Sequence, residues 1–330
     1  MSDGLASEVN MDVKRRAKLV FYSVGIFVCY SYYAIVQERI TRGKYVIKPG
    51  EEENFTYMLS LVCTQCIVNY LYAIFLSRTF MKQGENVTNW FYLAASALTY
   101  LLAMVCTNMA LKWVNYPTQV IGKSAKPIPV MVLGVLLGNK SYPAQKYFFV
   151  LLVVLGVALF MYKDGKQSKD NDSGFGFGEV LLGLALIMDG LTGAVQERMR
   201  SEYKTKSLHM MSSMNKWSVI FLSVCIIYTG ELTEFIKFVS RHQSIIWELI
   251  TFSIASAQGQ MFIFLMIEHF GPLPCSIVTT TRKLFTVLFS ILLFGNAITP
   301  RQWVGTFVVF GGLFLDTLYG KARRKERATE

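Results

Sequence analysis

The chain has 330 residues, of which 53% are hydrophobic and 17% charged, and its formal net charge is +11. Soluble domains carry about 25% charged residues, whereas apolar runs of about 20 residues recur along this whole sequence, as in a polytopic α-helical membrane protein. The connections between these runs are too short for a soluble domain that hydrolyses nucleotides, and no nucleophile–base pair converges. We therefore expect an all-α secondary transporter rather than an enzyme.

The predicted elements are about ten membrane-spanning helices. The chain is polar up to Lys18, and the first apolar run is too long for a signal peptide and lacks a small-residue cleavage site. We expect it to remain as an uncleaved anchor. The expected spans, in chain order, lie near residues 19–37, 55–77, 90–111, 117–138, 145–162, 178–196, 209–228, 245–267, 272–295 and 302–319.

Basic residues flank the first and the last predicted span. They are Lys14, Arg15, Arg16 and Lys18 before the first, and Lys321, Arg323, Arg324, Lys325 and Arg327 after the last. The positive-inside rule places both termini in the cytosol, which fits an even number of spans. The internal loops carry slightly more Lys and Arg on the opposite side, so the predicted orientation depends on the termini alone. Basic ends can also bind nucleic acid, but anchoring at the lipid membrane explains them better, and we expect no nucleic-acid partner.

The stretch QVIGKSAKPIPVMVLGVLLG, residues 119–138, is an apolar span with two cations and two prolines in its first half. Lys123 and Lys126 are three residues apart and share one helix face. Pro127 and Pro129 have no backbone N–H, so the carbonyls four residues before them lose their helical partners and the helix should kink just past the lysines. Backbone freed in this way is tolerated at membrane depth only where it faces protein or water. The stretch therefore predicts a break that lines a wet cavity.

Two pairs of segments recur in the two halves of the chain. AIVQERI near the end of the first span resembles GAVQERM near the end of the sixth, and LLGNKSYPAQK (136–146) resembles LFGNAITPRQW (293–303). The second pair is offset by 157 residues, and the same offset relates Lys126 to Lys283. Short identities at turn-rich loops also arise by chance. Five spans separate the copies, however, and units with an odd number of spans lie in opposite orientations, so the sequence predicts a 5+5 inverted repeat, typical of alternating-access transporters.

Four cations fall at corresponding depths in the fourth and ninth spans: Lys123, Lys126, Arg282 and Lys283. A cation at the centre of a membrane helix costs about 2.5–3.5 kcal/mol, so four would cost on the order of 10 kcal/mol if they faced lipid. We predict instead that they line a pocket for a polyanion, in which lysine supplies point charge and arginine clamps a phosphate group. The other predicted substrate-binding residues are Tyr116, Gln119, Ser124, Thr279 and Thr280, with Thr281 beside them.

The alternative is that acidic residues pair with these cations inside the protein. Asp189 in the sixth span is the acidic residue that falls in the middle of a span, and one carboxylate does not neutralise four cations. The repeated QER segments are more typical of ion pairs at helix ends than of substrate ligands, and they can also serve as a gate. The candidate gate or ion-pair residues are Glu38, Arg39, Glu197, Arg198 and Asp189.

Three further patterns carry no predicted chemistry. The GKS tripeptide in the fourth span lacks the earlier glycine of a phosphate-binding loop. Cys63-x-x-Cys66 lies inside a span without a partner pair, so we expect both cysteines to pack as small apolar side chains. The three histidines lie at span ends and form no cluster, so we expect no metal site.

Five motifs carry a resemblance to a known family: QERITRGKY, VNYPTQVIGKSAKPIPVMVLG, DGLTG, SAQGQMFIF and TTTRKLFTV. The sequence resembles the nucleotide-sugar transporter family, solute carrier family 35, of the drug/metabolite transporter superfamily, and within it subfamily B. The similarity covers nearly the whole chain.

The resemblance implies ten helices in a 5+5 inverted repeat, cytosolic termini, and antiport of ATP against ADP across the endoplasmic reticulum membrane. It implies that the basic substrate site lies on the four cations named above. The alternative is a nucleotide-sugar antiporter of the UDP-galactose type, which exchanges its substrate for a nucleoside monophosphate. Relatives often end in a dilysine retrieval signal, whereas this chain ends in RRKERATE, so the endoplasmic reticulum is implied by the resemblance alone and the Golgi membrane is the alternative.

The predicted organisation follows the repeats. It comprises a cytosolic N-terminal tail (1–18), a first five-helix repeat (19–162), a lumenal loop (163–177), a second five-helix repeat (178–319) and a basic cytosolic C-terminal tail (320–330).

Overall fold

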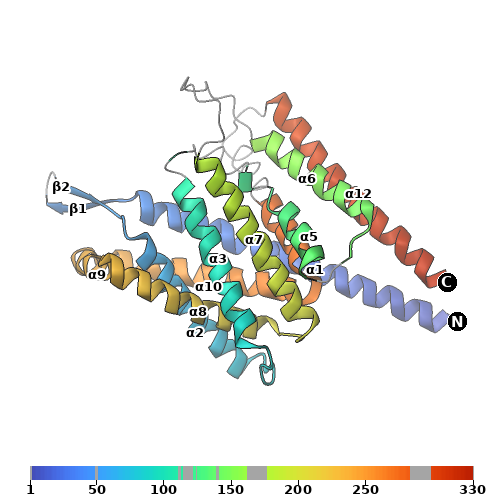
Figure 1. The fold of residues 1–330 in the computed structure, drawn as a ribbon, viewed down its shortest axis with the longest axis horizontal. Coiled ribbons are helices and arrows are strands. Elements are labelled where there is room, and N and C mark those ends of the chain that lie inside the picture. The colour runs from blue at the N-terminus through green and yellow to red at the C-terminus, as the bar shows by residue number, and fades with distance from the viewer. Residues whose placement is uncertain are drawn as a thin grey trace. The chain divides into compact units, whose positions relative to one another are not determined.

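The computed structural model describes residues 2–48, 51–110, 113, 122–123, 125–138, 141–161, 177–282 and 299–329. These residues form helices and a two-stranded hairpin (Figure 1). The elements, in chain order, are α1 (Ser2–Arg42), β1 (Lys44–Lys48), β2 (Glu51–Asn54), α2 (Met58–Thr79), α3 (Trp90–Ala110), α5 (Pro127–Leu136), α6 (Ala144–Met161), α7 (Phe177–Ser201), α8 (Ser207–Thr229), α9 (Glu231–Arg241), α10 (Ile245–Phe270) and α12 (Pro300–Thr329). Residues 272–282 are also helical.

Among the described residues, six helices are long and apolar enough to cross a membrane: α1, α2, α3, α7, α8 and α10. The apolar helices α5 and α6 are shorter. The protein is therefore a multi-pass helical membrane protein, as its composition predicts. The helix α1 begins at Ser2, far before the predicted first span, because the polar N-terminal residues continue the helix. Sequence analysis missed two elements between spans, the β1–β2 hairpin and α9.

The chain divides into two compact units, and each takes helices from both halves of the sequence. Unit 1 comprises Met1–Leu98 and Met199–Gly271, and unit 2 comprises Thr99–Arg198 and Pro272–Glu330. Packing therefore joins segments that are far apart in the chain, and the boundaries of these units differ from those of the predicted sequence repeats.

Two pairs of helices make up most of unit 1. A Cβ on Gly25 would lie 2.6 Å from the Phe262 ring, and a Cβ on Gly259 would lie 2.8 Å from the Tyr30 ring. Glycine at these two positions allows α1 and α10 to approach closely and to run antiparallel. The second pair is α2 with α8.

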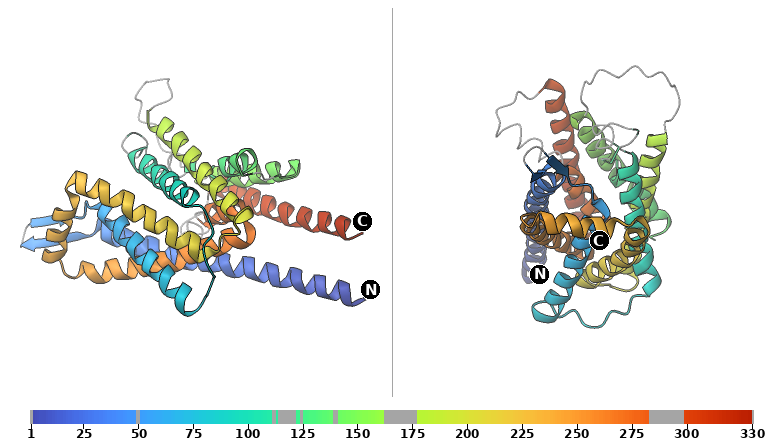
Figure 2. Two further views of the ribbon diagram at one scale, coloured as in Figure 1. Left: turned by 60° about the horizontal axis from the view of Figure 1, so that its bottom comes forward. Right: turned by 90° about the vertical axis from the view of Figure 1, so that its left-hand side faces the viewer.

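The β1–β2 hairpin packs against α9 at one end of unit 1 (Figure 2). Glu53 on β2 forms an ion pair with Arg241 at 2.8 Å, and a second one at 3.3 Å with Nε2 of His242 when that ring is protonated. The Tyr45 hydroxyl on β1 lies 3.5 Å from Oε2 of Glu248 on α10. Burial and this neighbouring carboxylate raise the pKa of Tyr45 to about 12. The hairpin is thus held to α9 and α10 by both charge and packing.

In unit 2, α6 and α12 lie side by side and antiparallel (Figure 2). A Cβ on Gly156 would lie 2.9 Å from the Gly305 carbonyl oxygen, and a Cβ on Gly305 would lie 2.8 Å from that of Gly156. Further along, a Cβ on Gly312 would lie 3.2 Å from the Leu152 side chain. These glycines bring the two helix backbones together.

The helix α7 lies between α3 and α5 within unit 2 and carries the aspartate of the DGLTG motif. Its first half packs on α3 through a small apolar core of Cys106, Ala110, Leu181, Leu182 and Ala185. A second core joins α5, α6 and the helical residues 272–282; it includes Val130, Met131, Val150, Val153, Leu273 and Ile277.

Candidate functional site

The helix is interrupted between Lys123 and Pro127, inside the predicted fourth span. The helix α5 begins at Pro127, a position where the missing N–H of proline leaves no helical bond unmade. The carbonyl of Lys123 accepts a hydrogen bond from the N–H of Lys126 at 3.3 Å, and that of Ala125 accepts one from Ile128 at 3.0 Å. Both bonds run three residues forward because the residue four positions on is proline in each case. The structure thus interrupts the helix at residues 125–126, between the two lysines, whereas the sequence predicts the kink just past them.

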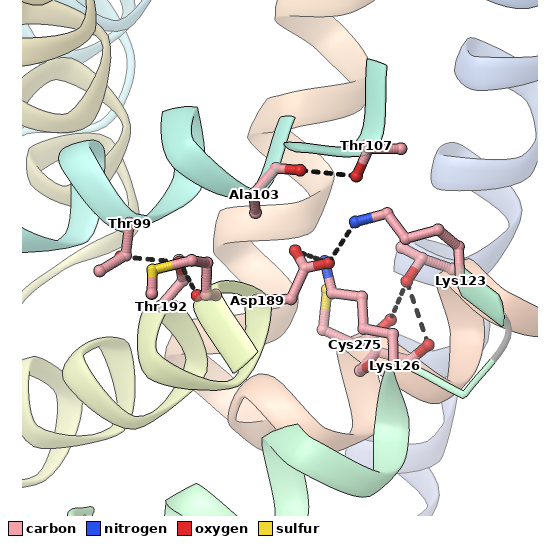
Figure 3. A network of polar contacts seen from close by, with 11 residues as sticks. Thr99, Ala103, Thr107, Lys123, Lys126, Asp189, Thr192 and Cys275 are labelled. Carbon is pink, nitrogen blue, oxygen red and sulfur yellow. Dashed lines mark hydrogen bonds and ion pairs between the residues drawn. The ribbon is translucent and has the colours of Figure 1, made fainter. Parts of the chain in front are cut away.

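Both lysines point to the carboxylate of Asp189 on α7 (Figure 3). Nζ of Lys123 lies 2.6 Å from Oδ2 of Asp189, and Nζ of Lys126 lies 3.0 Å from Oδ1. The Asp189 side chain is 6% exposed, against 17% for Lys123 and 35% for Lys126. Two cations and one anion therefore share a partly buried site with a formal charge of +1, and Lys126 is its most accessible member. We call these three residues the lysine–aspartate cluster.

Two glycines on α7 hold Asp189 close to the start of α5. A Cβ on Gly190 would lie 2.8 Å from the Pro129 carbonyl oxygen and 2.7 Å from the Leu133 side chain. A Cβ on Gly193 would meet another α5 side chain at 3.0 Å. Larger residues here would push the two helices apart. The DGLTG motif thus places a carboxylate beside the helix break.

Threonine hydroxyls around the cluster bond to backbone or to one another. The Thr192 hydroxyl lies 2.8 Å from that of Thr99 on α3 and 2.8 Å from a carbonyl one turn earlier on α7 (Figure 3). The hydroxyls of Thr279 and Thr281 bond back to carbonyls of their own helix at 3.0–3.1 Å, and Thr280 is buried. A hydroxyl has one hydrogen to donate, so in this arrangement Thr279 and Thr281 offer acceptor lone pairs rather than donors to a ligand.

The remaining predicted substrate-binding residues are less fully described. Arg282 is half-buried at the end of the helical residues 272–282. The predicted ligands Lys283, Tyr116, Gln119 and Ser124 lie outside the described residues, as does the side chain of Glu38. Of the predicted set, the structure brings together Lys123, Lys126 and Asp189.

The QER segments differ in their surroundings. Arg39 is exposed near the end of α1, whereas Glu197 is buried near the end of α7. Nε of Arg198 donates a hydrogen bond to the carbonyl of Leu137, just past the end of α5. This bond ties the C-terminal ends of α5 and α7 together.

A second polar cluster, which sequence analysis missed, lies between α2, α8 and α10 in unit 1. Nε2 of Gln65 donates to the Ser256 hydroxyl at 2.7 Å, and Nδ2 of Asn215 donates to Oε1 of Gln260 at 2.6 Å. Nδ2 of Asn69 lies 3.4 Å from Oδ1 of Asn215 and 3.3 Å from the Ser256 hydroxyl. We call these five residues the amide cluster. Polar residues four apart inside apolar spans, at 65 and 69 and at 256 and 260, are the signal that could have found it.

The lysine–aspartate cluster has the chemistry of an anion site. Lysine ammonium groups donate hydrogen bonds and accept none, and the start of α5 adds the positive end of a helix dipole. Among the described residues, no group of three or more His, Cys, Asp or Glu could hold a metal ion. The arrangement can therefore attract an anion by charge, within a limit that Asp189 sets.

Comparisons with known proteins point to transport. The family described as the UAA transporter family matches residues 18–320. The chain is 54% identical over 319 residues to the solute carrier family 35 member B1 homolog of Drosophila melanogaster, which covers 94% of this chain and 93% of that protein. It is 52% identical over 311 residues to solute carrier family 35 member B1 of Gallus gallus (94% and 95% covered) and 49% identical over 322 residues to that of Danio rerio (97% of each). A solved crystal structure of a protein that is 11% identical has a similar fold, with a TM-score of 0.64 over 94% of this chain and 99% of that chain.

Proposed function

Because the chain belongs to the UAA transporter family, we propose that it is a nucleotide antiporter that exchanges ATP and ADP across the endoplasmic reticulum membrane by alternating access. The predicted membership of solute carrier family 35, the nucleotide-sugar transporters, is confirmed by its relatives. The exchanged pair is inferred from charge and from the resemblance of the motifs, and the endoplasmic reticulum membrane from that resemblance.

The observation that carries the proposal is the pair of lysines at a broken membrane helix. Burying charge in a membrane span is expensive, and Asp189 balances one of the two lysines. A phosphate group is the ligand class that fits the remaining positive charge. We assign phosphate binding to Lys123, Lys126, Arg282 and Lys283, with Tyr116, Gln119, Ser124, Thr279 and Thr280 around them, and a gating role to the QER residues Glu38, Arg39, Glu197 and Arg198.

Contacts at the two ends of α7 support a full crossing by the interrupted fourth span. The ring of Trp113 lies 4.9 Å from that of Phe177 at the start of α7, and Leu137 bonds Arg198 near its end. The described residues Trp113 and Leu137 therefore lie beside opposite ends of α7, although α5 itself has 10 residues. The chain must then return through α6 to reach the start of α7, and α12 lies antiparallel along α6. This favours ten crossings with both termini on one side, which we take to be the cytosol.

The pairing of helices also supports an inverted repeat of five plus five spans, with residues 19–162 and 178–319 as the two copies. In the predicted order of spans, each helix of the first repeat corresponds to the helix five spans later. By this rule α2 corresponds to α8, α6 to α12, and α5 to the helical residues 272–282, and each of these helices packs against its own counterpart. The same shift relates the antiparallel α1–α10 pair to α7–α3, which is also an antiparallel pair. Symmetric pairing of this kind is expected where two inverted copies interlock.

Glycosylation mapping tests this orientation. The sequence holds four sequons, at Asn54, Asn86, Asn139 and Asn171. With cytosolic termini, Asn54 and Asn171 face the lumen, and Asn171 in the longer polar loop is the better acceptor, since Asn54 ends β2 close to α2. Endoglycosidase-sensitive modification at Asn86 or Asn139 would overturn the orientation.

Obligate exchange follows from charge in a closed cavity. The four cations proposed to line the site carry like charges, which repel by several kcal/mol in an occluded space even at an effective dielectric near 20. A bound polyanion removes this penalty, so the loaded carrier crosses and the empty one does not. ATP carries roughly three to four negative charges and ADP one fewer, so both can offset this repulsion.

One observation favours a less anionic substrate as the second candidate. Asp189 already pairs with both lysines, which leaves a smaller positive charge than the sequence alone suggests. A nucleotide sugar of the UDP-galactose type, with about two negative charges, also fits such a site. That carrier would exchange the nucleotide sugar for a nucleoside monophosphate, and the Golgi membrane would then be as suitable a location.

Uptake by purified protein in proteoliposomes distinguishes the two candidates. Vesicles are preloaded in turn with ADP, UMP or buffer, and the uptake of labelled ATP and labelled UDP-galactose is measured in each. The proposal expects ATP uptake that depends on internal ADP. Uptake of UDP-galactose driven by internal UMP, without ATP uptake, would establish the second candidate.

A further inference from the structure

The carboxylate of Asp189 contacts the ammonium group of Lys126, the most exposed residue of the lysine–aspartate cluster. Its two carboxylate oxygens lie 2.6 Å and 3.0 Å from the ammonium groups of Lys123 and Lys126. Lys126 keeps 35% of its side chain exposed, whereas the Asp189 side chain is 6% exposed. A phosphate that reaches Lys126 therefore feels the Asp189 charge at short range, and each further negative charge on the ligand increases that repulsion.

The position of this carboxylate is fixed by backbone packing. Aspartate has a short side chain, and the next residue on α7, Gly190, lies so close to Pro129 on α5 that a Cβ would approach its carbonyl oxygen to 2.8 Å. This packing holds the Asp189 backbone close to α5, where the carboxylate reaches both lysines. Lys126 has a long side chain and can turn toward a ligand.

The start of α5 gives a ligand no free backbone donor within residues 126–130. Pro127 and Pro129 have no N–H, and the N–H groups of Lys126, Ile128 and Val130 bond to carbonyls of the preceding turn at 3.0–3.3 Å. A phosphate at this helix end must therefore be held by side-chain charge rather than by backbone N–H groups. A change of one unit in side-chain charge should then alter affinity strongly.

We propose that Asp189 sets how many negative charges the site accepts, and so determines specificity among nucleotides that differ in their number of phosphates. This inference rests on the proposed function and extends it by naming the residue behind charge selection. The substitution Asp189→Asn raises the charge of the cluster from +1 to +2 and keeps a carbonyl acceptor for one lysine. At a separation of about 10 Å and an effective dielectric near 20, each extra ligand charge then gains on the order of tenfold in affinity.

The test compares ligands of increasing charge on the full-length protein in proteoliposomes. Apparent affinities for AMP, ADP and ATP are measured by counter-exchange for the wild type, D189N and D189E. Because ATP carries about two more negative charges than AMP, we expect the ratio of ATP to AMP affinity to rise on the order of a hundredfold in D189N and to stay near the wild-type value in D189E, which keeps the charge. An equal ratio in all three proteins would overturn the role of Asp189.

A second comparison protects the test if D189N fails to accumulate, because two unpaired buried lysines can destabilise the fold. The variant K123Q lowers the charge of the cluster to zero, and the double variant K123Q/D189N returns it to +1. Nucleotide-dependent thermal stabilisation, which needs binding but not transport, should show a lower ATP to AMP preference in K123Q and a wild-type preference in the double variant. The same preference in both variants would contradict the proposal.

Failure of this inference is distinguishable from failure of the proposed function. A wild-type protein that exchanges none of these nucleotides removes the proposed function before any variant is compared. A wild-type protein that exchanges them, with a preference that D189N leaves unchanged, removes the role of Asp189 alone.

Discussion

Two polar clusters lie between membrane helices, one in each compact unit, and they differ in charge and in backbone. The lysine–aspartate cluster of unit 2 holds three ions beside the break before α5. The amide cluster of unit 1 holds neutral side chains on α2, α8 and α10, which continue as regular helices through it. In the amide cluster, donors and acceptors largely meet one another, although Oδ1 of Asn69 accepts no hydrogen bond from the described residues.

The difference indicates which cluster is built to respond to a ligand. Neutral hydrogen bonds between membrane helices contribute about 0.6 kcal/mol each on average. The amide cluster therefore stabilises the packing of α2, α8 and α10 only modestly. The lysine–aspartate cluster retains a charge of +1 that no described residue of the cluster balances, at a place where the backbone is already open. A charged ligand can lower the energy of the lysine–aspartate cluster far more than that of the amide cluster.

The largest expected effect follows from removing a cation. Lys126→Ala and Lys283→Ala should each reduce nucleotide uptake to background while leaving the protein in the membrane, because each removes charge from the proposed phosphate site. The matched control is Lys206→Ala, which breaks the ion pair of an exposed lysine with the partly buried Glu268 and should leave uptake unchanged. Radiolabelled uptake, normalised to membrane protein, measures this. Variants that are degraded, with normal transport by the protein that survives, would show that the lysines stabilise the fold instead.

The sequence was sufficient to locate this cluster's cations and to name Asp189 as a candidate partner, but not to show that Asp189 contacts both lysines. The break before α5 follows from Pro127 and Pro129, which remove backbone N–H groups. A break of this kind can be predicted from a short stretch of sequence. The pairing of Asp189 with both lysines depends on how closely α7 approaches α5, which in turn depends on Gly190. Sequence alone gives no distance between segments more than 60 residues apart, so it could not decide between a substrate site and internal ion pairs.

The next effect concerns this close approach. Gly190→Ala puts a Cβ within 2.7–2.9 Å of α5 and should cost about 1–3 kcal/mol of stability through overpacking, with reduced exchange because Asp189 moves. Gly183→Ala makes the same change on the same helix, where a Cβ meets nothing within 4 Å, and should be neutral or stabilising by up to ~1 kcal/mol. Melting curves of the detergent-solubilised variants compare them. Equal melting temperatures would mean that α5 and α7 are not packed as described.

A smaller effect is expected in the amide cluster. Asn69→Leu removes a fully buried amide that lies between Asn215 and Ser256, and it should lower stability by about 1 kcal/mol. It should leave the ratio of ATP to AMP affinity unchanged, since it alters no charge. A shift in that ratio comparable with the one expected for D189N would show that the two clusters do not differ in the way proposed.

The two missed elements, the hairpin and α9, show where sequence reading was weakest. Lys44–Lys48 and Glu51–Asn54 are short and highly charged, so their strand pairing has no alternating apolar pattern. Their stability comes from tertiary contacts: Phe55 and Phe238 pack in one buried core with Ile245 and Phe252. Local patterns do not reveal elements that form only when distant residues cover them.

The smallest effect concerns this hairpin. Tyr45→Phe keeps the ring packed but removes the hydroxyl that bonds the Ile40 carbonyl at 3.1 Å, and it should cost about 1 kcal/mol. The raised pKa of Tyr45, about 12, gives the sign of the pH dependence: its contribution is complete below pH ~10, the ordinary tyrosine value, and is lost as pH rises through about 12. The melting temperatures of wild type and variant should differ at pH 8 and converge as the pH rises through about 12. Tyr228→Phe, at a 91% exposed tyrosine, is the control without effect.

The central claim, that a charged cavity moves only when a nucleotide fills it, is tested most directly by efflux of labelled ADP from preloaded proteoliposomes. The account predicts slow efflux into nucleotide-free buffer and a strong increase when ATP is added outside, with no increase in the Lys126→Ala variant. Brisk efflux into nucleotide-free buffer, or stimulation by UDP-galactose and not by ATP, would contradict it.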